Sequence, residues 1–227
     1  FKKNFSGNHI IIFGANTSKK INSNKKYFNS MIITDNNFDI ISQYDKKKLV
    51  PFGEFLPFEN FFNAFGLKKL TPGYASFSKG DSNNIIDLEF DSKNIKILPL
   101  ICYEIIFTNL INTENEFNFI INISEDAWFG ESIGPHQHFS KSIFRAIEQN
   151  SYLVRSANRG FSAIINNKGQ IINKLNPTVA FIIEPPKVAS GTNIYSKDIH
   201  NLLFLRNKLI GYTALRKRSC VLYNTKS

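Results

Sequence analysis

The stretch that decides the fold is residues 95–107, which read IKILPLICYEIIF. Residues 95–102 form an almost unbroken apolar run, typical of a strand buried on both faces. From Glu104 onward, the segment EIIFTNLIN has apolar residues at helical spacing and predicts that a helix begins. Cys102 then lies at a strand-to-helix turn, where a nucleophile is exposed and the helix N-terminus favours the thiolate. The alternative is that Cys102 is a small buried hydrophobic residue.

Outward from this stretch, short apolar runs alternate with helical patterns. An Asp35-Asn36-Asn37 turn between two runs predicts a hairpin. This alternation indicates an α/β domain with a mostly buried sheet. Further strands are predicted at residues 9–13, 27–34, 38–44, 117–124, 152–156, 162–165 and 170–174, helices at 58–67 and 138–150, and loops at 70–79 and 126–134. In the helix at 138–150, one apolar face is expected from Phe139, Ile143, Ala146 and Ile147.

Composition narrows the class of protein. The chain has 227 residues, 42% of them hydrophobic, with a net charge of +10. The lysines are scattered, and no basic stripe interleaved with aromatic residues indicates a nucleic-acid interface. An anionic membrane surface is a better candidate partner for the charge. No stretch approaches the roughly 18–20 apolar residues of a membrane span.

Two other features concern the ends of the chain. It begins with Phe1, so we expect a piece of a longer protein. From residue 193 the apolar pattern is broken by basic residues, which predicts a compact domain at 1–192 and a basic tail at 193–227, poorly packed or forming a surface helix. Cys102 and Cys220 are the two cysteines. They do not make a disulfide framework, and the state of Cys220 is left open.

Acyl-transfer chemistry gives the neighbours of Cys102 possible roles. A cysteine nucleophile needs a proton acceptor and a positive group near the developing oxyanion. Lys46 could supply the positive group, and Glu54 or Glu104 could supply a carboxylate if an apolar pocket raises its pKa. The alternative for Lys46 and Glu54 is that each is an ordinary solvated charge.

Three ordered blocks carry a family resemblance. They are residues 44–54 (YDKKKLVPFGE), 101–104 (ICYE), and 122–162, which includes DAWFG, His138, RAIE and RSANRGFS. Together they resemble the carbon–nitrogen hydrolase (nitrilase) superfamily and, within it, the apolipoprotein N-acyltransferase family. The resemblance implies a four-layer α-β-β-α sandwich, here incomplete at its N-terminal end.

The resemblance also implies residue roles. Cys102 matches the nucleophile, Lys46 the lysine that stabilises the oxyanion, and Glu54 a second glutamate that supports them. Residues matching the lining of the substrate pocket are Tyr103, Glu104 and Trp128. The family's general-base glutamate lies on a segment before the first strand, so this piece alone is expected to be inactive. Two smaller departures are Glu125, where the family usually has Asn, and the charged residues 193–227, where it has a membrane helix.

Structural alternatives stay open for several of these positions. Trp128 could be an anchoring core aromatic. A buried Arg–Glu pair tying helix to sheet would account for Arg145, Glu148 and Arg155 without a substrate. His136 and His138 lack carboxylate partners at ligand spacing, so the sequence does not predict a zinc site.

The function implied is movement of an acyl chain from a phospholipid, through a cysteine thioester, to the α-amino group of a lipoprotein's N-terminal diacylglyceryl-cysteine. This chemistry needs no metal or organic cofactor. The implied partners are phospholipid, diacylglyceryl lipoprotein and a membrane surface, not nucleic acid, with the domain on the periplasmic side of a bacterial inner membrane. The alternatives are a soluble amidase of the same superfamily and a catalytically inactive binding domain with this fold.

Overall fold

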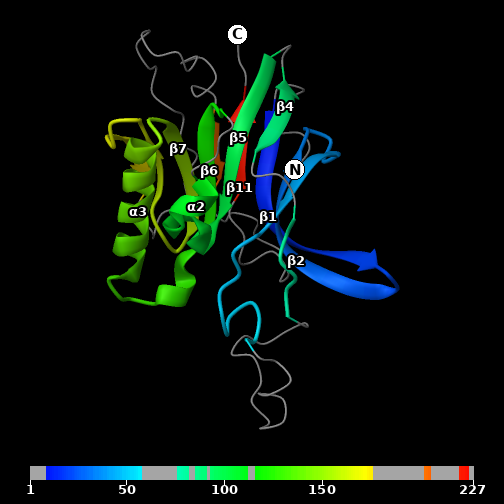
Figure 1. Cartoon of the computed structure of the whole chain (residues 1–227). Helices are drawn as coiled ribbons and strands as arrows, with labels where there is room; N and C mark the ends of the chain where they lie inside the picture. The colour runs from blue at the N-terminus through cyan, green and yellow to red at the C-terminus, as the bar shows by residue number, and fades with distance from the viewer. Residues whose placement is uncertain are drawn as a thin grey trace.

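Two β-sheets packed face to face form the framework of the molecule (Figure 1). The computed structural model describes residues 9–57, 76–81, 85–90, 93–111, 116–175, 202–205 and 220–224. Helices cover the outer face of one of the sheets, so the described residues form a helix layer and two sheet layers. This arrangement confirms the predicted α/β class.

The first sheet has five strands, in the order β10-β11-β1-β2-β3, and every pairing in it is antiparallel. Its longest pair, β1 with β2, is a hairpin that extends well beyond the rest of the sheet (Figure 1). The strands are β1 (His9–Ile21), β2 (Asn24–Thr34), β3 (Ile40–Asp45), β10 (Leu202–Leu205) and β11 (Cys220–Asn224).

The second sheet has six strands in sequence order, from β4 to β9. Its centre is parallel, because β5 pairs with β6 and β6 with β7 in parallel, whereas the outer pairings are antiparallel. The carboxyl ends of three central strands therefore meet at one edge, where loops of α/β proteins carry function. The strands are β4 (Ile86–Phe90), β5 (Lys93–Ile101), β6 (Phe119–Glu125), β7 (Tyr152–Asn158), β8 (Ser162–Ile165) and β9 (Ile171–Leu175).

The central strands divide their side chains between two cores. In β5, Ile97 and Ile101 pack between the sheets, whereas Leu98 and Leu100 pack toward the helices. This alternation is the period of two expected of a strand, with both faces apolar because both are covered. The inter-sheet core also contains Ile12 and Tyr44, so it is the contact that fixes one sheet on the other.

Four helical segments complete the described structure. Two short ones follow β5, and α3 lies along the outer face of the six-stranded sheet (Figure 1). They are the 3-10 helices η2 (Cys102–Ile106) and η3 (Asp126–Phe129), and the α-helices α2 (Thr108–Ile111) and α3 (Gly134–Glu148). The predicted helix after Cys102 is thus split into η2 and α2, which leaves no long helix dipole at the thiol.

Other differences from the sequence predictions have local causes. β1 continues past residue 13 to Ile21, because the polar residues there pair with β2 at the tip of the hairpin. The prediction of a poorly packed tail or surface helix is wrong for residues 202–205 and 220–224, which form strands joined to β1. The helix predicted at 58–67, the first part of the loop at 70–79 and the rest of residues 193–227 lie outside the described residues. The domain boundary at 192 stays a prediction.

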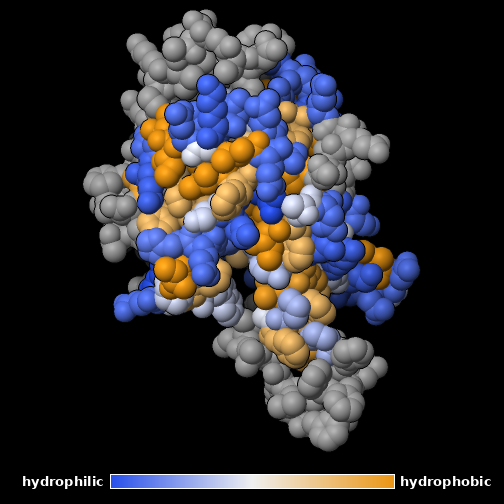
Figure 2. Space-filling view, turned by 60° about the vertical axis from the view of Figure 1, so that its left-hand side comes forward, coloured by the Kyte–Doolittle hydropathy of each residue, from blue (hydrophilic) through white to orange (hydrophobic). Residues whose placement is uncertain are grey.

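The outer surface of α3 is less polar than its sequence pattern predicts. Phe139 and Ala146 are buried as expected, but Ile147 is 46% exposed and Phe144 is 55% exposed. Ile147 therefore lies at the partly exposed margin of the predicted apolar face, beside Gly169. Figure 2 shows this face of the molecule, with apolar surface visible between hydrophilic side chains.

Among the residues that the structure describes, no helix combines the length and apolar character needed to cross a bilayer.

Candidate active site

Cys102 lies at the carboxyl end of β5, as the sequence predicts. It is the first residue of η2, a free thiol, and partly buried against the inter-sheet core. Its φ is 52°, in the left-handed region that residues other than glycine rarely adopt. Residues with strained backbone conformations cluster at functional sites.

Lys46 and Glu54 form a close ion pair at the end of β3. Lys46 Nζ lies 2.8 Å from Glu54 Oε2, with the lysine side chain 1% exposed and the glutamate 14%. Val50 N also donates to Glu54 Oε2 at 2.8 Å, and Asn29 Nδ2 donates to Oε1 at 2.6 Å. A buried ammonium held by a carboxylate in this way is not a solvated surface charge, so that alternative is wrong for this pair.

The main chain of Lys46 is fixed as firmly as its ammonium. Its N–H donates to Asn29 O at 2.8 Å, and its carbonyl accepts from Gly80 N at 2.9 Å. Gly80 must be glycine, because a Cβ there would lie 2.1 Å from the carbonyl oxygen of Asp45. Strand β2 on one side and residue 80 on the other therefore set the position of Lys46.

Glu104 joins the Lys46 loop to the Cys102 turn. Its Oε1 accepts from Lys47 N at 2.7 Å, Lys48 N at 3.1 Å and Tyr44 Oη at 3.0 Å. Its Oε2 accepts from Ile101 N at 2.8 Å. One carboxylate therefore holds residues on both sides of Lys46 and the residue before Cys102, which brings the two predicted catalytic segments together.

This role differs from the substrate-pocket role predicted for Glu104. The side chain is 0% exposed and both carboxylate oxygens accept hydrogen bonds from the protein, while contact of Glu104 with substrate stays a prediction. Burial raises the pKa of Glu104, and the hydrogen bonds from Ile101 and Lys48 together with the charge of Lys46 oppose that rise without cancelling it. Glu104 is therefore a structural link within the site.

A second buried polar network lies behind Cys102, on the helix side of the sheet. Its members Asp126, His138 and Arg155 come from η3, α3 and β7. Asp126 is 2.8 Å from Arg155 Nη2 and 2.9 Å from His138 Nδ1. Burial alone would raise the pKa of Asp126, but Arg155 and His138 lower it to about 2. The acid is therefore a carboxylate at neutral pH.

Sequence reasoning missed this network. It paired Arg155 with glutamate, but the arginine binds Asp126 and Asn122. The available signal was the arginine in the middle of the apolar strand YLVRSAN, since a fully buried arginine requires a carboxylate. Arg145 does pair with Glu148, but within α3 and with Glu148 46% exposed, so this pair does not tie helix to sheet. It is Arg145 Nε, donating to Ile105 O at 2.9 Å, that ties α3 to η2.

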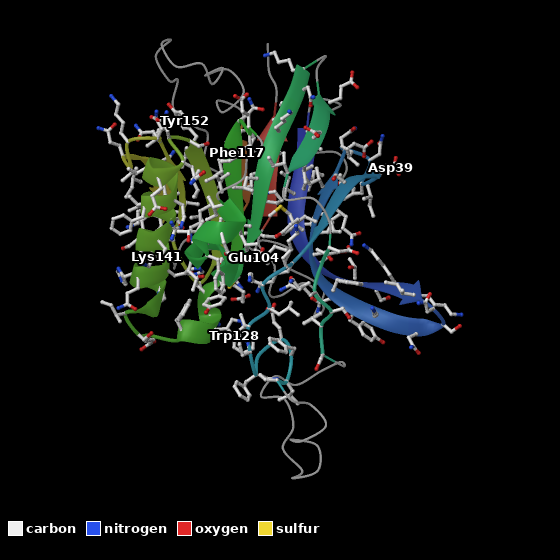
Figure 3. The ribbon with its side chains drawn as sticks, viewed as in Figure 1. Asp39, Glu104, Phe117, Trp128, Lys141 and Tyr152 are labelled. Atoms are coloured by element: carbon white, nitrogen blue, oxygen red, sulfur yellow. The ribbon has the colours of Figure 1, made fainter. Side chains whose placement is uncertain are left out.

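Tyr103 and Trp128, the two predicted aromatic pocket residues, follow the parallel strands β5 and β6 and so lie at the same edge of the sheet. Figure 3 shows Trp128 beyond Glu104, at the end opposite Phe117 and Tyr152. Trp128 is 68% exposed, so it is not a core aromatic, and the ring of Tyr103 packs edge-on against Phe107 at 4.9 Å. Their contact with substrate stays a prediction. Within the described residues, no group of three or more His, Cys, Asp or Glu is placed to hold a metal ion.

Several apolipoprotein N-acyltransferases are similar to this chain. The chain is 41% identical over 173 residues to an apolipoprotein N-acyltransferase of Rickettsia prowazekii, covering 75% of this chain and 34% of that protein. It is 40% identical over 172 residues to that of Rhizobium leguminosarum bv. trifolii, covering 74% and 32%. The chain thus spans about a third of the length of these relatives.

Solved structures and the family comparison agree on the fold. An amidase from Nesterenkonia sp. matches with a TM-score of 0.51 at 14% identity, covering 74% of this chain and 57% of that one. A variant of the Nesterenkonia AN1 amidase from the nitrilase superfamily also matches at 0.51, with 11% identity, covering 96% and 62%. Residues 6–183 match the carbon-nitrogen hydrolase family as a whole. The chain therefore belongs to the carbon–nitrogen hydrolase family.

Proposed function

We propose that this chain is the catalytic part of an N-acyltransferase, with Cys102 as the nucleophile. The observation that carries the proposal is the buried Lys46–Glu54 pair, which Glu104 ties to the Cys102 turn. Relatives about 40% identical over three quarters of the chain carry the acyltransferase name, which favours this reaction over hydrolysis of small amides.

The first half-reaction forms a thioester. The Cys102 sulfur attacks the acyl carbonyl of a phospholipid, the thiol proton passes to a carboxylate base, and the ester bond breaks to release a lysophospholipid that takes up that proton. The ammonium of Lys46 stabilises the oxyanion of the tetrahedral intermediate, where a fixed charge in a water-poor site has its largest effect. Glu54 keeps that ammonium in place.

The second half-reaction transfers the acyl group. The α-amino group of a lipoprotein's N-terminal diacylglyceryl-cysteine attacks the thioester, an amide bond forms, and the Cys102 thiol is regenerated. One nucleophile thus serves an ester donor and an amine acceptor in turn, which is ping-pong chemistry. Exposed Trp128, with Phe129 at 38% exposure beside it, offers apolar surface to the acyl chains.

The proposed setting is the periplasmic face of a bacterial inner membrane. Both proposed substrates carry acyl chains and reside in a bilayer. The net charge of +10 favours contact with anionic lipid headgroups.

Acylation of the protein by a tagged lipid tests the first half-reaction. The complete gene product, in detergent micelles, is incubated with a phospholipid bearing an alkyne on its acyl chain, and peptides are mapped by mass spectrometry. The expected result is a hydroxylamine-sensitive adduct on Cys102 that is absent in Cys102→Ala. An adduct that survives hydroxylamine, or one that persists in Cys102→Ala, overturns the proposal.

A peptide acceptor tests the second half-reaction. The acylated protein is offered a diacylglyceryl-cysteine peptide with a free α-amino group and, as the matched control, the same peptide with that amine acetylated. Transfer to the free amine alone is expected. Release of the chain as free fatty acid at the same rate with both peptides indicates a hydrolase.

A further inference from the structure

The backbone of Cys102 needs support that the Lys46 loop does not give. Its φ of 52° is a conformation that a residue with a Cβ leaves unless its surroundings hold it. Glu104 anchors the residue before Cys102 but accepts nothing from Cys102 itself. The element that fixes Cys102 must therefore act on another of its atoms.

That atom is the carbonyl oxygen of Cys102. His138 Nε2 lies 3.2 Å from it, and Asn122 Nδ2 approaches it at 3.5 Å while donating to Leu100 O at 3.0 Å. His138 comes from α3, on the helix side of the sheet, whereas Cys102 packs against the inter-sheet core. The contact therefore holds the Cys102 turn from behind.

The other ring nitrogen of His138, Nδ1, also has two polar partners. His138 Nδ1 lies 2.9 Å from Asp126 Oδ1 and 3.1 Å from Arg155 Nη2. Asp126 Oδ1 also accepts from Ser124 Oγ at 2.6 Å, and Arg155 Nη1 donates to Asn122 Oδ1. His138 is 5% exposed, and Asp126 and Arg155 are 0% exposed, so water does not compete for these bonds.

The proton positions on the imidazole follow from these partners. A carbonyl oxygen only accepts, so an attractive contact with Cys102 O requires a proton on Nε2. A neutral ring with that proton accepts from Arg155 at Nδ1, and a doubly protonated ring donates from Nδ1 to Asp126. Both states keep the Nε2 proton on Cys102 O, whereas a ring protonated only at Nδ1 turns a lone pair toward it.

We propose that His138, oriented by Asp126 and Arg155, is a positioning residue that holds Cys102 in its left-handed conformation and so sets the direction of the thiol. The inference rests on the proposed function only in taking Cys102 as the nucleophile. Loss of the Nε2 donor lets the turn relax and changes the direction of the sulfur.

Alkylation of Cys102 measures the direction of the thiol without any turnover. The second-order rate with iodoacetamide is followed by peptide mass spectrometry in the folded chain, with circular dichroism and a melting curve on each variant. His138→Phe fills the space without a donor, and we expect it to slow alkylation about tenfold, the loss of one buried hydrogen bond. In His138→Gln the side-chain amide reaches the position of Nε2, and we expect a rate within about threefold of wild type.

His136 supplies the matched control. It lies two residues earlier on the same helix, is exposed, and packs its ring on Phe161 at 4.7 Å. His136→Phe is expected to leave the alkylation rate unchanged. A folded His138→Phe variant that reacts as fast as wild type, or faster, overturns the proposal, and so does a His138→Gln variant as slow as His138→Phe.

Nitrogen NMR of the wild-type chain tests the same idea without a variant. The ¹⁵N shifts of His138 are expected to show a protonated Nε2, and a ring protonated only at Nδ1 contradicts the proposal. Both readouts are independent of lipid. A protein that is never acylated but shows these rates and shifts refutes the proposed function and leaves the positioning role standing.

Discussion

Two acidic side chains, both 0% exposed, support the Cys102 turn from opposite sides. They differ in the groups that bind their carboxylates. Glu104 accepts from backbone N–H groups and from Tyr44, which are neutral donors. Asp126 binds the guanidinium of Arg155 and the imidazole of His138. Burial raises the pKa of Glu104, whereas Arg155 and His138 lower the pKa of Asp126 to about 2 despite burial.

The difference shows that burial alone does not decide the charge of an acid. At Glu104, the neutral donors and the charge of Lys46 reduce the cost of desolvation without cancelling it, so the pKa still rises. An arginine at hydrogen-bonding distance reverses the balance. Protonation is therefore easier at Glu104 than at a solvated glutamate, whereas Asp126 is held as a carboxylate.

Removal of the cation should give the largest effect. Arg155→Met leaves Asp126 buried without its main partner, and we expect a loss of about 3–5 kcal/mol in the free energy of unfolding. Urea denaturation followed by circular dichroism measures it. The surface variant Arg159→Met is the control, because Arg159 is exposed. A loss below about 1 kcal/mol would mean that the Asp126–Arg155 ion pair does not stabilise the fold.

Removal of the charge from Glu104 should give a smaller effect. In Glu104→Gln, one oxygen that accepts hydrogen bonds becomes an NH₂ group, which faces an N–H donor. We expect destabilisation of about 1–3 kcal/mol, the cost of one unsatisfied buried group. The same denaturation experiment on Glu89→Gln, an exposed glutamate of β4, gives the baseline. Equal stability of the two variants would contradict the role of Glu104 as a structural link between the Lys46 loop and the Cys102 turn.

The pH dependence separates the two acids by sign. The pKa of Asp126 falls from 3.8 to about 2 on folding, so its contribution of about 2 kcal/mol is present above pH 4 and is lost as the pH falls toward about 2. The pKa of Glu104 is raised, so its contribution is present at low pH and is lost as the pH rises above its ordinary value. The free energy of unfolding, measured from about pH 7 down to pH 2, should therefore fall less steeply in Asp126→Asn than in wild type. A steeper fall in the variant would reverse the assignment.

Relief of the strain at Cys102 should give the smallest effect, with the opposite sign. Cys102→Ala keeps a Cβ at φ 52°, whereas Cys102→Gly removes it. We expect the glycine variant to be more stable than the alanine variant by about 1 kcal/mol, measured by thermal unfolding. Alanine as the more stable of the two would show that the left-handed conformation costs nothing.

Local patterns in the sequence were enough for part of this architecture. The apolar run at residues 95–102 predicted a buried strand, and its end placed Cys102 at the sheet edge. The outer half of β1 was missed, because residues 14–20 are small or polar and carry no alternation of apolar side chains. Strands β10 and β11 were missed because the charged residues between them hid two short apolar runs.

The residues of the site also fall into those that local motifs predicted and those that they could not predict. Lys46, Glu54 and Cys102 could be proposed because each lies in a motif that resembles a family, and the structure brings their segments together. The partners of Arg155 could not, since Asp126 and His138 are separated from it by 29 and 17 positions. Contacts of that range depend on the pairing of β6 with β7 and on the packing of α3, which no local pattern contains.

The rate of thioester formation in Lys46→Met tests the central claim most directly, because it asks whether the buried ammonium serves the cysteine. With the complete gene product and a tagged phospholipid, the rate of Cys102 acylation is expected to fall at least about 100-fold, the loss of one fixed oxyanion-stabilising group. Lys48→Met, whose ammonium in wild type lies over the Phe107 ring, should acylate at the wild-type rate. A folded Lys46→Met variant that acylates as fast as Lys48→Met would contradict the account.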